Sequence, residues 1–216
     1  MREAGNKCTD HRPLTTDHCP ASPILGPMIS ELKAQPAPAG PPRRIVLTGF
    51  MGSGKTTVGP LLARQMGWSF VDVDDLIAAE AGCTIPELFE RHGETAFRDL
   101  ERATIARLAS GDTLVLALGG GAIEDAATRA LLLASPDTLL VHLEVELATT
   151  LARCRGTENL RPVLADQANL ASRYERRLPF YRMAHVSIAV DALTPQQVVE
   201  AIVRAVPAAA RHASAS

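Results

Sequence analysis

The sequence is poor in cysteine, in aromatic residues and in excess charge of either sign. Its four cysteines are scattered and form no C-x-x-C pair, which argues against a metal cluster or a disulfide framework and favours a reducing, cytoplasmic setting. Aromatic residues make up 4% of the chain and the net charge is −2, so neither stacking platforms nor a basic field for nucleic acid is present. No apolar run approaches the roughly 20 residues of a membrane span. We therefore expect no nucleic-acid or membrane partner.

The first 42 residues differ in composition from the rest of the chain. They are rich in Pro, Thr, Ala and His, show no helix or strand period, and end in the run PAPAGPP at 36–42. Such a segment buries too little apolar surface to offset the entropy cost of ordering it, so we expect residues 1–42 to be a disordered extension. The alternative is that translation begins at Met28. At the other end, residues 207–216 are expected to fray.

From Arg43 onward, short apolar runs alternate with helical patterns. A capping pattern at Thr84 predicts a short helix that ends near Gly93, followed by a longer helix over 94–109. Strands separated by helices predict an α/β fold, a five-stranded parallel sheet with helices on both faces. Ligands bind such sheets beyond the carboxyl ends of the strands. The predicted strands cover 45–48, 69–74, 113–118, 138–143 and 186–190.

The most specific motif follows the first predicted strand. Residues 49–56, GFMGSGKT, match G-x-x-x-x-G-K-[ST], the P-loop pattern, between a β-branched run and a helix candidate. Gly52 and Gly54 would let backbone N–H groups close round a polyphosphate, because a side chain there would block the approach. Lys55 would reach the β- and γ-phosphates, and the Thr56 hydroxyl would ligate Mg²⁺. A chance match is the alternative, but the strand–turn–helix context favours binding of a nucleoside triphosphate.

The acid that accompanies Mg²⁺ in many P-loop enzymes is missing from its usual place. The third predicted strand runs into Leu118-Gly119 and carries no carboxylate at its end. Asp72 and Asp74 lie two apart on a predicted strand, so their side chains should share a face and point at the cleft. We expect one near the metal and the other on a substrate hydroxyl. The alternative is that Asp72, Asp74 and Asp75 cap the next helix.

Three arginines and a glycine run also fall in segments that should border the cleft. Around Arg98, we expect Phe97 and Leu100 to face the core, which leaves Arg98 to face the site. Taken singly, Arg98, Arg161 and Arg177 are each better explained as solvated arginines, since arginine is mostly exposed. The glycine run 119–121 is more informative, because consecutive glycines after a strand imply close approach of the backbone to a ligand or to another loop.

In order and spacing, these motifs resemble those of the shikimate kinases. The matching pieces are the P-loop 49–59, Asp72-x-Asp74, Ile85-x-Glu-Leu-Phe89, Gly93-Glu94-x-x-Phe97-Arg98-x-x-Glu101, Gly119-Gly-Gly121, Arg161-Pro162 and Pro179-x-Tyr181. The resemblance covers about residues 43–206. It implies a fold similar to the nucleoside monophosphate kinases, with a small substrate-binding subdomain at about 74–103 and a lid at about 153–168.

The resemblance also implies an activity and roles for individual residues. The γ-phosphoryl group of ATP would pass to the 3-hydroxyl of shikimate, on the route to chorismate and the aromatic amino acids. Lys55, Asp74 and Arg161 would be catalytic, with Arg161 closing over the phosphates from the lid, and Thr56 and Asp72 would hold Mg²⁺. Shikimate would contact Asp74, Arg98, Gly120 and Arg177, and the ATP phosphates would contact Gly52, Ser53, Gly54, Lys55, Thr56 and Thr57. ATP and shikimate are the partners expected of such an enzyme, which we expect to be a monomer.

The sequence does not decide which arginine contacts adenine, and it leaves a competing function to be considered. The lid segment is about one residue longer than usual, so either Arg153 or Arg155 would lie against adenine. A gluconate-type sugar kinase shares the fold and the P-loop, but it would not explain the Asp72-x-Asp74 pair together with Phe97-Arg98 and the glycine run. A GTP-dependent switch would need an N-K-x-D motif, which does not occur. A non-catalytic nucleotide-binding module is disfavoured because every expected catalytic position is filled.

Overall fold

The computed structural model describes residues 37–154 and 167–206. The expectations for residues 1–36 and for the tail 207–216 lie outside these ranges. So do Arg155, Arg161 and most of the expected lid. Among the described residues, no helix combines the length and the apolarity that crossing a membrane requires.

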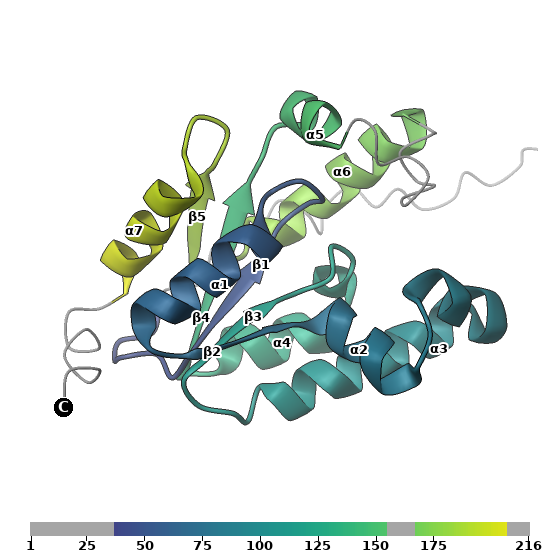
Figure 1. Cartoon of the computed structure of the whole chain (residues 1–216), viewed down its shortest axis with the longest axis horizontal. Helices are drawn as coiled ribbons and strands as arrows, with labels where there is room; N and C mark the ends of the chain where they lie inside the picture. The colour runs from purple at the N-terminus through teal and green to yellow at the C-terminus, as the bar shows by residue number, and fades with distance from the viewer. Residues whose placement is uncertain (1–36, 155–166, 207–216) are drawn as a thin grey trace, which may run out of the picture. The chain divides into compact units, whose positions relative to one another are not determined.

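Five parallel strands form one sheet, as the sequence predicts (Figure 1). Their order is β2-β3-β1-β4-β5, so the chain segment that leaves β1 emerges in the middle of the sheet. All 5 residues of β1 are buried, as expected for a strand that is covered on both faces. The strands are β1 (Arg44–Thr48), β2 (Ser69–Asp72), β3 (Leu114–Ala117), β4 (Thr138–Glu144) and β5 (Val186–Ala189).

Helices cover both faces of this sheet, which confirms the predicted α/β architecture. In Figure 1, α1 (Lys55–Met66) and α7 (Pro195–Ala205) lie together in front of the strands, and α4 (Ala126–Ala134) lies behind them. A capping box opens α7: the Thr194 hydroxyl accepts a hydrogen bond from the Gln197 backbone N–H, and the Gln197 side chain accepts one from the Thr194 N–H. The remaining elements are α2 (Val73–Ala81), α3 (Ile85–Leu108), the 3₁₀ turn η1 (Ala122–Glu124), α5 (Leu147–Arg153) and α6 (Gln167–Tyr181).

Helix α3 contains the two helices that the sequence predicts, joined across a kink. Thr84 forms the expected capping box with Glu87, and Gly93 breaks the helix with φ 78° and ψ 169°. The buried positions after the kink include Phe97, Glu101 and Ile105, which recur at helical spacing on one face. Leu100 lies off this face and is 39% exposed. The expectation that Leu100 faces the core is therefore wrong, and a glutamate occupies the inward position.

The boundary between β2 and α2 corrects the sequence-based argument about the aspartates. The strand ends at Asp72, and Asp74 belongs to the first turn of α2. Asp72 is the N-cap of this helix, and its Oδ1 accepts a 3.1 Å hydrogen bond from the Asp74 backbone N–H. Asp72 and Asp74 therefore do not share one strand face, and the prediction that they do is wrong. Of the three aspartates, Asp72 takes the capping role and Asp75 does not.

Candidate active site

The P-loop connects the central strand β1 to helix α1. Gly54 is the N-cap of α1 and has φ 94°, a left-handed conformation that favours glycine. The Lys55 ammonium folds back over the loop and donates to the carbonyl oxygens of Gly49 at 2.8 Å and Phe50 at 3.2 Å. The first turn of α1 has no acidic residue. The positive end of the helix and the Lys55 ammonium therefore lie together at the loop, an arrangement that suits an anion.

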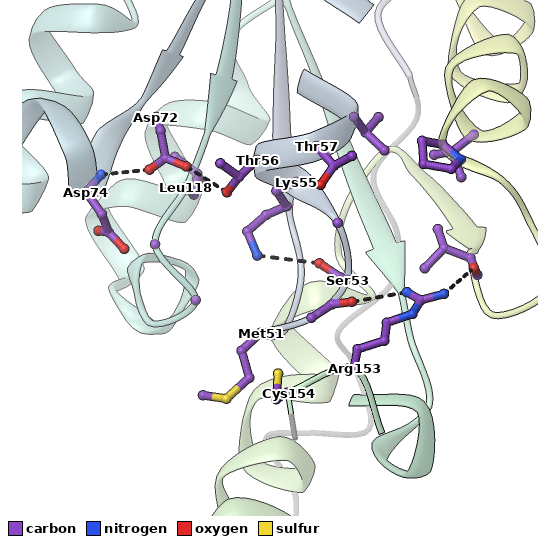
Figure 2. Close-up of a pocket in the computed structure, with 18 of the residues that line it drawn as sticks. Met51, Ser53, Lys55, Thr56, Thr57, Asp72, Asp74, Leu118, Arg153 and Cys154 are labelled. Atoms are coloured by element: carbon purple, nitrogen blue, oxygen red, sulfur yellow. Dashed lines mark hydrogen bonds between the residues drawn. The ribbon is translucent and has the colours of Figure 1, made fainter. Parts of the chain in front are cut away.

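A cavity of about 710 Å³ opens beside this loop (Figure 2). This size is within the usual range for small-molecule sites. In Figure 2 the Lys55 ammonium and the Asp74 carboxylate point into the same space. Of the residues that the sequence singles out, those lining the cavity are Gly52, Ser53, Gly54, Lys55, Thr56, Thr57, Asp72, Asp74, Gly119, Gly120, Arg153 and Arg177.

Thr56 and Asp72 form a pair of oxygen groups at the edge of the cavity. The Thr56 hydroxyl donates a 3.1 Å hydrogen bond to Asp72 Oδ2, while the other carboxylate oxygen caps α2. Mg²⁺ prefers oxygen ligands and typically takes one or two protein groups together with water and substrate phosphates. A hydroxyl and a carboxylate held side by side next to a P-loop fit that requirement.

Asp74 is the carboxylate that lies deeper in the site. Within the described residues its Oδ1 is buried and has no hydrogen-bond partner. Burial, followed by the nearby Asp72 charge, raises the pKa of Asp74, while the Lys55 and Arg98 charges oppose the rise. An ionised carboxylate with an unused acceptor oxygen is well suited to accept a hydrogen bond or a proton from a hydroxyl group.

The glycine run after β3 is the point where the predicted substrate-binding side chains meet. A Cβ placed on Gly119 would lie 2.6 Å from Asp74 Oδ1. A Cβ on Gly120 would lie 3.5 Å from Arg177 Nη1, and one on Gly121 would lie 2.5 Å from Arg98 Nη2. One of the predicted substrate-binding side chains thus lies against each of the three successive glycines. This arrangement explains the run, because at least two of the three positions have no room for a methyl group.

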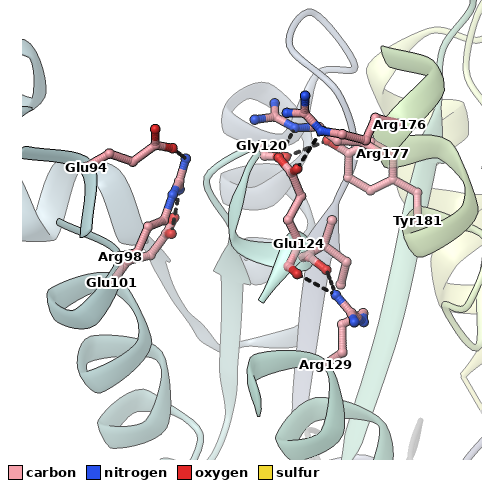
Figure 3. Close-up of polar contacts among 10 residues, drawn as sticks. Glu94, Arg98, Glu101, Gly120, Glu124, Arg129, Arg176, Arg177 and Tyr181 are labelled. Carbon is pink, nitrogen blue, oxygen red and sulfur yellow. Dashed lines mark hydrogen bonds and ion pairs between the residues drawn. The ribbon is translucent and has the colours of Figure 1, made fainter. Parts of the chain in front are cut away.

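Arg98 is held against Gly121 by two glutamates of its own helix (Figure 3). Its guanidinium donates to Glu101 at 2.7 Å and to Glu94 at 3.2 Å. Glu101 is only 2% exposed, and its Oε1 lies beside Gly119, buried and without a partner in the described part of the chain. Burial raises the pKa of Glu101, and the Arg98 charge opposes this rise. No role is predicted for Glu101 from the sequence, although its position three residues after Arg98 on a helix indicates an ion pair.

Arg177 enters the site from α6 and is 6% exposed. Its Nε donates a 2.5 Å hydrogen bond to Glu124 at the end of η1 (Figure 3). The last residue of α6, Tyr181, donates from its hydroxyl to the Gly120 carbonyl oxygen at 2.6 Å. The sequence does not reveal either hydrogen bond, because each one joins two segments that are more than fifty residues apart in the chain.

Arg153 lies at the opposite end of the cavity. Its guanidinium donates to the carbonyl oxygens of Gly52 and Val190, each at 3.1 Å. Beside it the cavity wall is apolar and is formed by Val190, Leu193, Pro195 and Val198. Of the two arginines that the sequence leaves open for adenine, Arg153 therefore lines the cavity, and Arg155 lies outside the described residues.

The fold and the cavity together define a class of protein. A P-loop at the central strand of a parallel sheet, with a second group of charged side chains next to it, is the arrangement of a P-loop enzyme that binds a nucleoside triphosphate beside a small acceptor. Residues 51–207 match the shikimate kinase family. The chain belongs to this family, and its activity is ATP-dependent phosphorylation of shikimate in the biosynthesis of aromatic amino acids.

Proteins named shikimate kinase align with this chain over most of their length. The shikimate kinase of Salinibacter ruber is 42% identical over 183 residues, which cover 80% of this chain and 88% of that protein. The shikimate kinase of Moorella thermoacetica is 41% identical over 152 residues, covering 69% and 86%. Among solved structures, the shikimate kinase of Acinetobacter baumannii in complex with shikimate has a TM-score of 0.70 and 35% identity, covering 78% of this chain and 93% of that one.

Proposed function

We propose that this chain transfers the γ-phosphoryl group of ATP to the 3-hydroxyl of shikimate, and that shikimate binds at the glycine run 119–121. The observation that carries the placement is the convergence of Asp74, Arg177 and Arg98 on these three glycines. A hydroxylated ring with one carboxylate matches this set, since guanidinium groups pair with the carboxylate and Asp74 accepts from a hydroxyl. The related protein of Acinetobacter baumannii, whose structure holds shikimate, supports the same substrate class.

ATP would bind along the P-loop side of the cavity. Gly52, Ser53, Gly54 and Thr57 would surround its phosphates with backbone and hydroxyl groups, and adenine would lie between Arg153 and the apolar wall at Pro195. Thr56 and Asp72 would hold Mg²⁺, which neutralises phosphate charge when it is bound. Arg161 would complete the cationic surroundings of the phosphates, at a position outside the described residues.

Phosphoryl transfer requires positioning and charge stabilisation more than covalent chemistry. Asp74 Oδ1, which is buried without a partner among the described residues, would accept the hydrogen bond of the attacking hydroxyl and then its proton. The raised pKa of Asp74 makes it a better proton acceptor than an ordinary carboxylate. Lys55 would exchange its contacts with Gly49 and Phe50 for oxygens of the phosphoryl group in transfer.

The decisive experiment compares Asp74→Asn with Asp75→Asn in a coupled assay of ADP release. Asp75 lies in the same helical turn but does not line the cavity, so its variant is a matched control. We expect Asp74→Asn to abolish shikimate-dependent ADP release while ATP binding stays nearly intact, and Asp75→Asn to retain activity. Equal turnover of Asp74→Asn and wild type would overturn the role given to Asp74. The same assay with gluconate tests the alternative kinase, and activity on gluconate alone would refute the substrate.

We also propose that the enzyme is a cytoplasmic monomer without a nucleic-acid or membrane partner. The scattered cysteines, the net charge of −2 and the low aromatic content support this assignment. Light scattering at micromolar concentration tests the monomeric state. We expect a mass near 23.0 kDa, and a doubled mass would contradict a monomer.

A further inference from the structure

We propose that Glu124 is a positioning residue for carboxylate recognition: it holds Arg177 by its Nε edge and so directs the terminal nitrogens of the guanidinium toward the substrate. This inference rests on the proposed binding of shikimate at the glycine run. Glu124 is the last residue of η1, the turn that follows this run directly. Glu124 thus links the glycine run to Arg177, which lies against Gly120.

One carboxylate engages two arginines of α6 (Figure 3). Glu124 Oε1 accepts from Arg177 Nε at 2.5 Å, and Oε2 accepts from Arg176 Nε at 3.0 Å. A guanidinium carries five N–H donors in a rigid plane, so a bond at Nε fixes the direction of the others. Nη1 of Arg177 then lies next to Gly120, 3.5 Å from where a Cβ would be, on the cavity side.

The backbone of Glu124 is also held in place. Arg129 donates from Nη1 to the carbonyl oxygens of Ile123 and Glu124, both at 2.7 Å. The Arg129 guanidinium in turn lies 4.3 Å from the centre of the Phe180 ring on α6. The turn η1 is therefore fixed between α4 and α6, so the carboxylate cannot easily follow Arg177 if the arginine moves.

The charges in this cluster favour an anionic ligand. Burial raises the pKa of Glu124, but hydrogen bonds from Arg176 and Arg177 and their charges outweigh it, so the pKa lies below its usual value and the carboxylate stays ionised at neutral pH. One negative and two positive side chains leave a surplus positive charge. Arg176 is 58% exposed and Arg177 is 7% exposed at their side chains. Arg176 thus offsets Glu124 from the solvent side, and Arg177 keeps its attraction for a substrate carboxylate.

The test uses Glu124→Ala and Glu124→Gln, with Glu80→Ala as the control. Glu80 accepts a hydrogen bond from Arg107 at 2.7 Å in an exposed pair far along the chain from the glycine run. We expect Glu124→Ala to raise the KM for shikimate by about tenfold, as expected when a charged hydrogen-bond partner is lost. Its kcat at saturation and its KM for ATP should stay close to wild type. Glu124→Gln should lie between the two, because its amide oxygen still accepts from Arg177, and Glu80→Ala should match wild type.

The methyl ester of shikimate separates positioning from a merely structural role. If Glu124 acts through Arg177 on the carboxylate, the KM penalty of Glu124→Ala should largely disappear with the ester. An unchanged KM for shikimate, or an equal penalty on acid and ester, would overturn the proposal. If Glu124→Ala does not fold, Glu124→Gln decides the question on the same two substrates. Failure of the proposed function would be visible separately, as wild-type enzyme that does not phosphorylate shikimate.

Discussion

The hydroxyl of Tyr181 donates a 2.6 Å hydrogen bond to the carbonyl oxygen of Gly120. It ties helix α6 to the glycine run, on which the predicted substrate-binding side chains Asp74, Arg98 and Arg177 converge. Tyr181 is fully buried and stacks on His142 with ring centres 5.1 Å apart. Burial raises the pKa of Tyr181 and lowers the pKa of His142 to about 4, so both rings are uncharged at neutral pH. The phenol therefore remains a hydrogen-bond donor over the working range of the enzyme.

Tyr181→Phe should weaken both the fold and the substrate site. Loss of the hydroxyl leaves the Gly120 carbonyl without this donor, which costs about 1–3 kcal/mol in the free energy of unfolding. It should also raise the KM for shikimate more than that for ATP. The matched control is Tyr174→Phe on the same helix. This change removes a 3.0 Å hydrogen bond from the Tyr174 hydroxyl to the carbonyl oxygen of Val145. Urea unfolding and steady-state kinetics of both variants check this, and equal effects on the KM for shikimate would contradict it.

Gly119→Ala should inactivate the enzyme while leaving the protein folded. The new methyl group would lie 2.6 Å from Asp74 Oδ1 and 2.7 Å from Glu101 Oε1, so the two carboxylates must move. Since displacement of about 1 Å can cost about a hundredfold in rate, we expect a fall of that order in kcat/KM for shikimate. Gly111→Ala is the control, because its nearest neighbour would be 3.3 Å away. Wild-type kinetics in Gly119→Ala would show that the glycine run does not set the position of Asp74.

Asp74→Asn should stabilise the protein that it inactivates. The pKa of Asp74 is raised in the fold, so the folded chain binds this proton more tightly than the unfolded chain. The group then contributes stability that is complete below its unfolded pKa of about 3.9 and is lost as the pH rises through the folded value. Near pH 7 the ionised form is a net cost that asparagine removes.

The measurement for Asp74 is the urea midpoint of wild type and Asp74→Asn from pH 4 to 8. The advantage of the variant should be largest near neutrality and shrink as the pH falls and wild-type Asp74 becomes protonated. Asp99→Asn, at an exposed carboxylate of α3, should show no such gain. A variant that is less stable than wild type at pH 7 would contradict the prediction.

Arg98→Ala should raise the KM for shikimate and also destabilise the fold. In the proposed site, Arg98 would contact the substrate carboxylate in both the ground state and the transition state, so its loss should change KM more than kcat. Removal of the arginine also leaves Glu101, 2% exposed, as an unpaired buried carboxylate, which typically costs about 3–5 kcal/mol. Combining Arg98→Ala with Glu101→Gln should restore much of the stability but not the KM. Recovery of both would mean that Arg98 acts only through the fold.

Local patterns in the sequence were sufficient for the scaffold. The glycines and Lys55 predicted the phosphate loop, the alternation of apolar and helical segments predicted the parallel sheet, and the capping pattern at Thr84 predicted a helix start. These features depend on neighbours a few residues apart, so their physical causes are visible in the sequence. Prediction failed where two local tendencies compete. The apolar pattern predicts that Asp72 and Asp74 lie on a strand, although the capping preference of Asp72 begins a helix there.

Only the tertiary structure decided how the charged side chains of the site are arranged. Nothing in the sequence around Arg177 indicates that Glu124, 53 positions earlier, holds its Nε. Nor does helical periodicity predict a buried Glu101 where an apolar residue would normally lie. Burial of a charge is favourable only when distant segments bring a partner of opposite charge, and such pairings are set by how the sheet orders its loops. The sequence by itself predicts a phosphate-binding loop at residues 49–56, and the folded chain determined which carboxylates and arginines surround that loop.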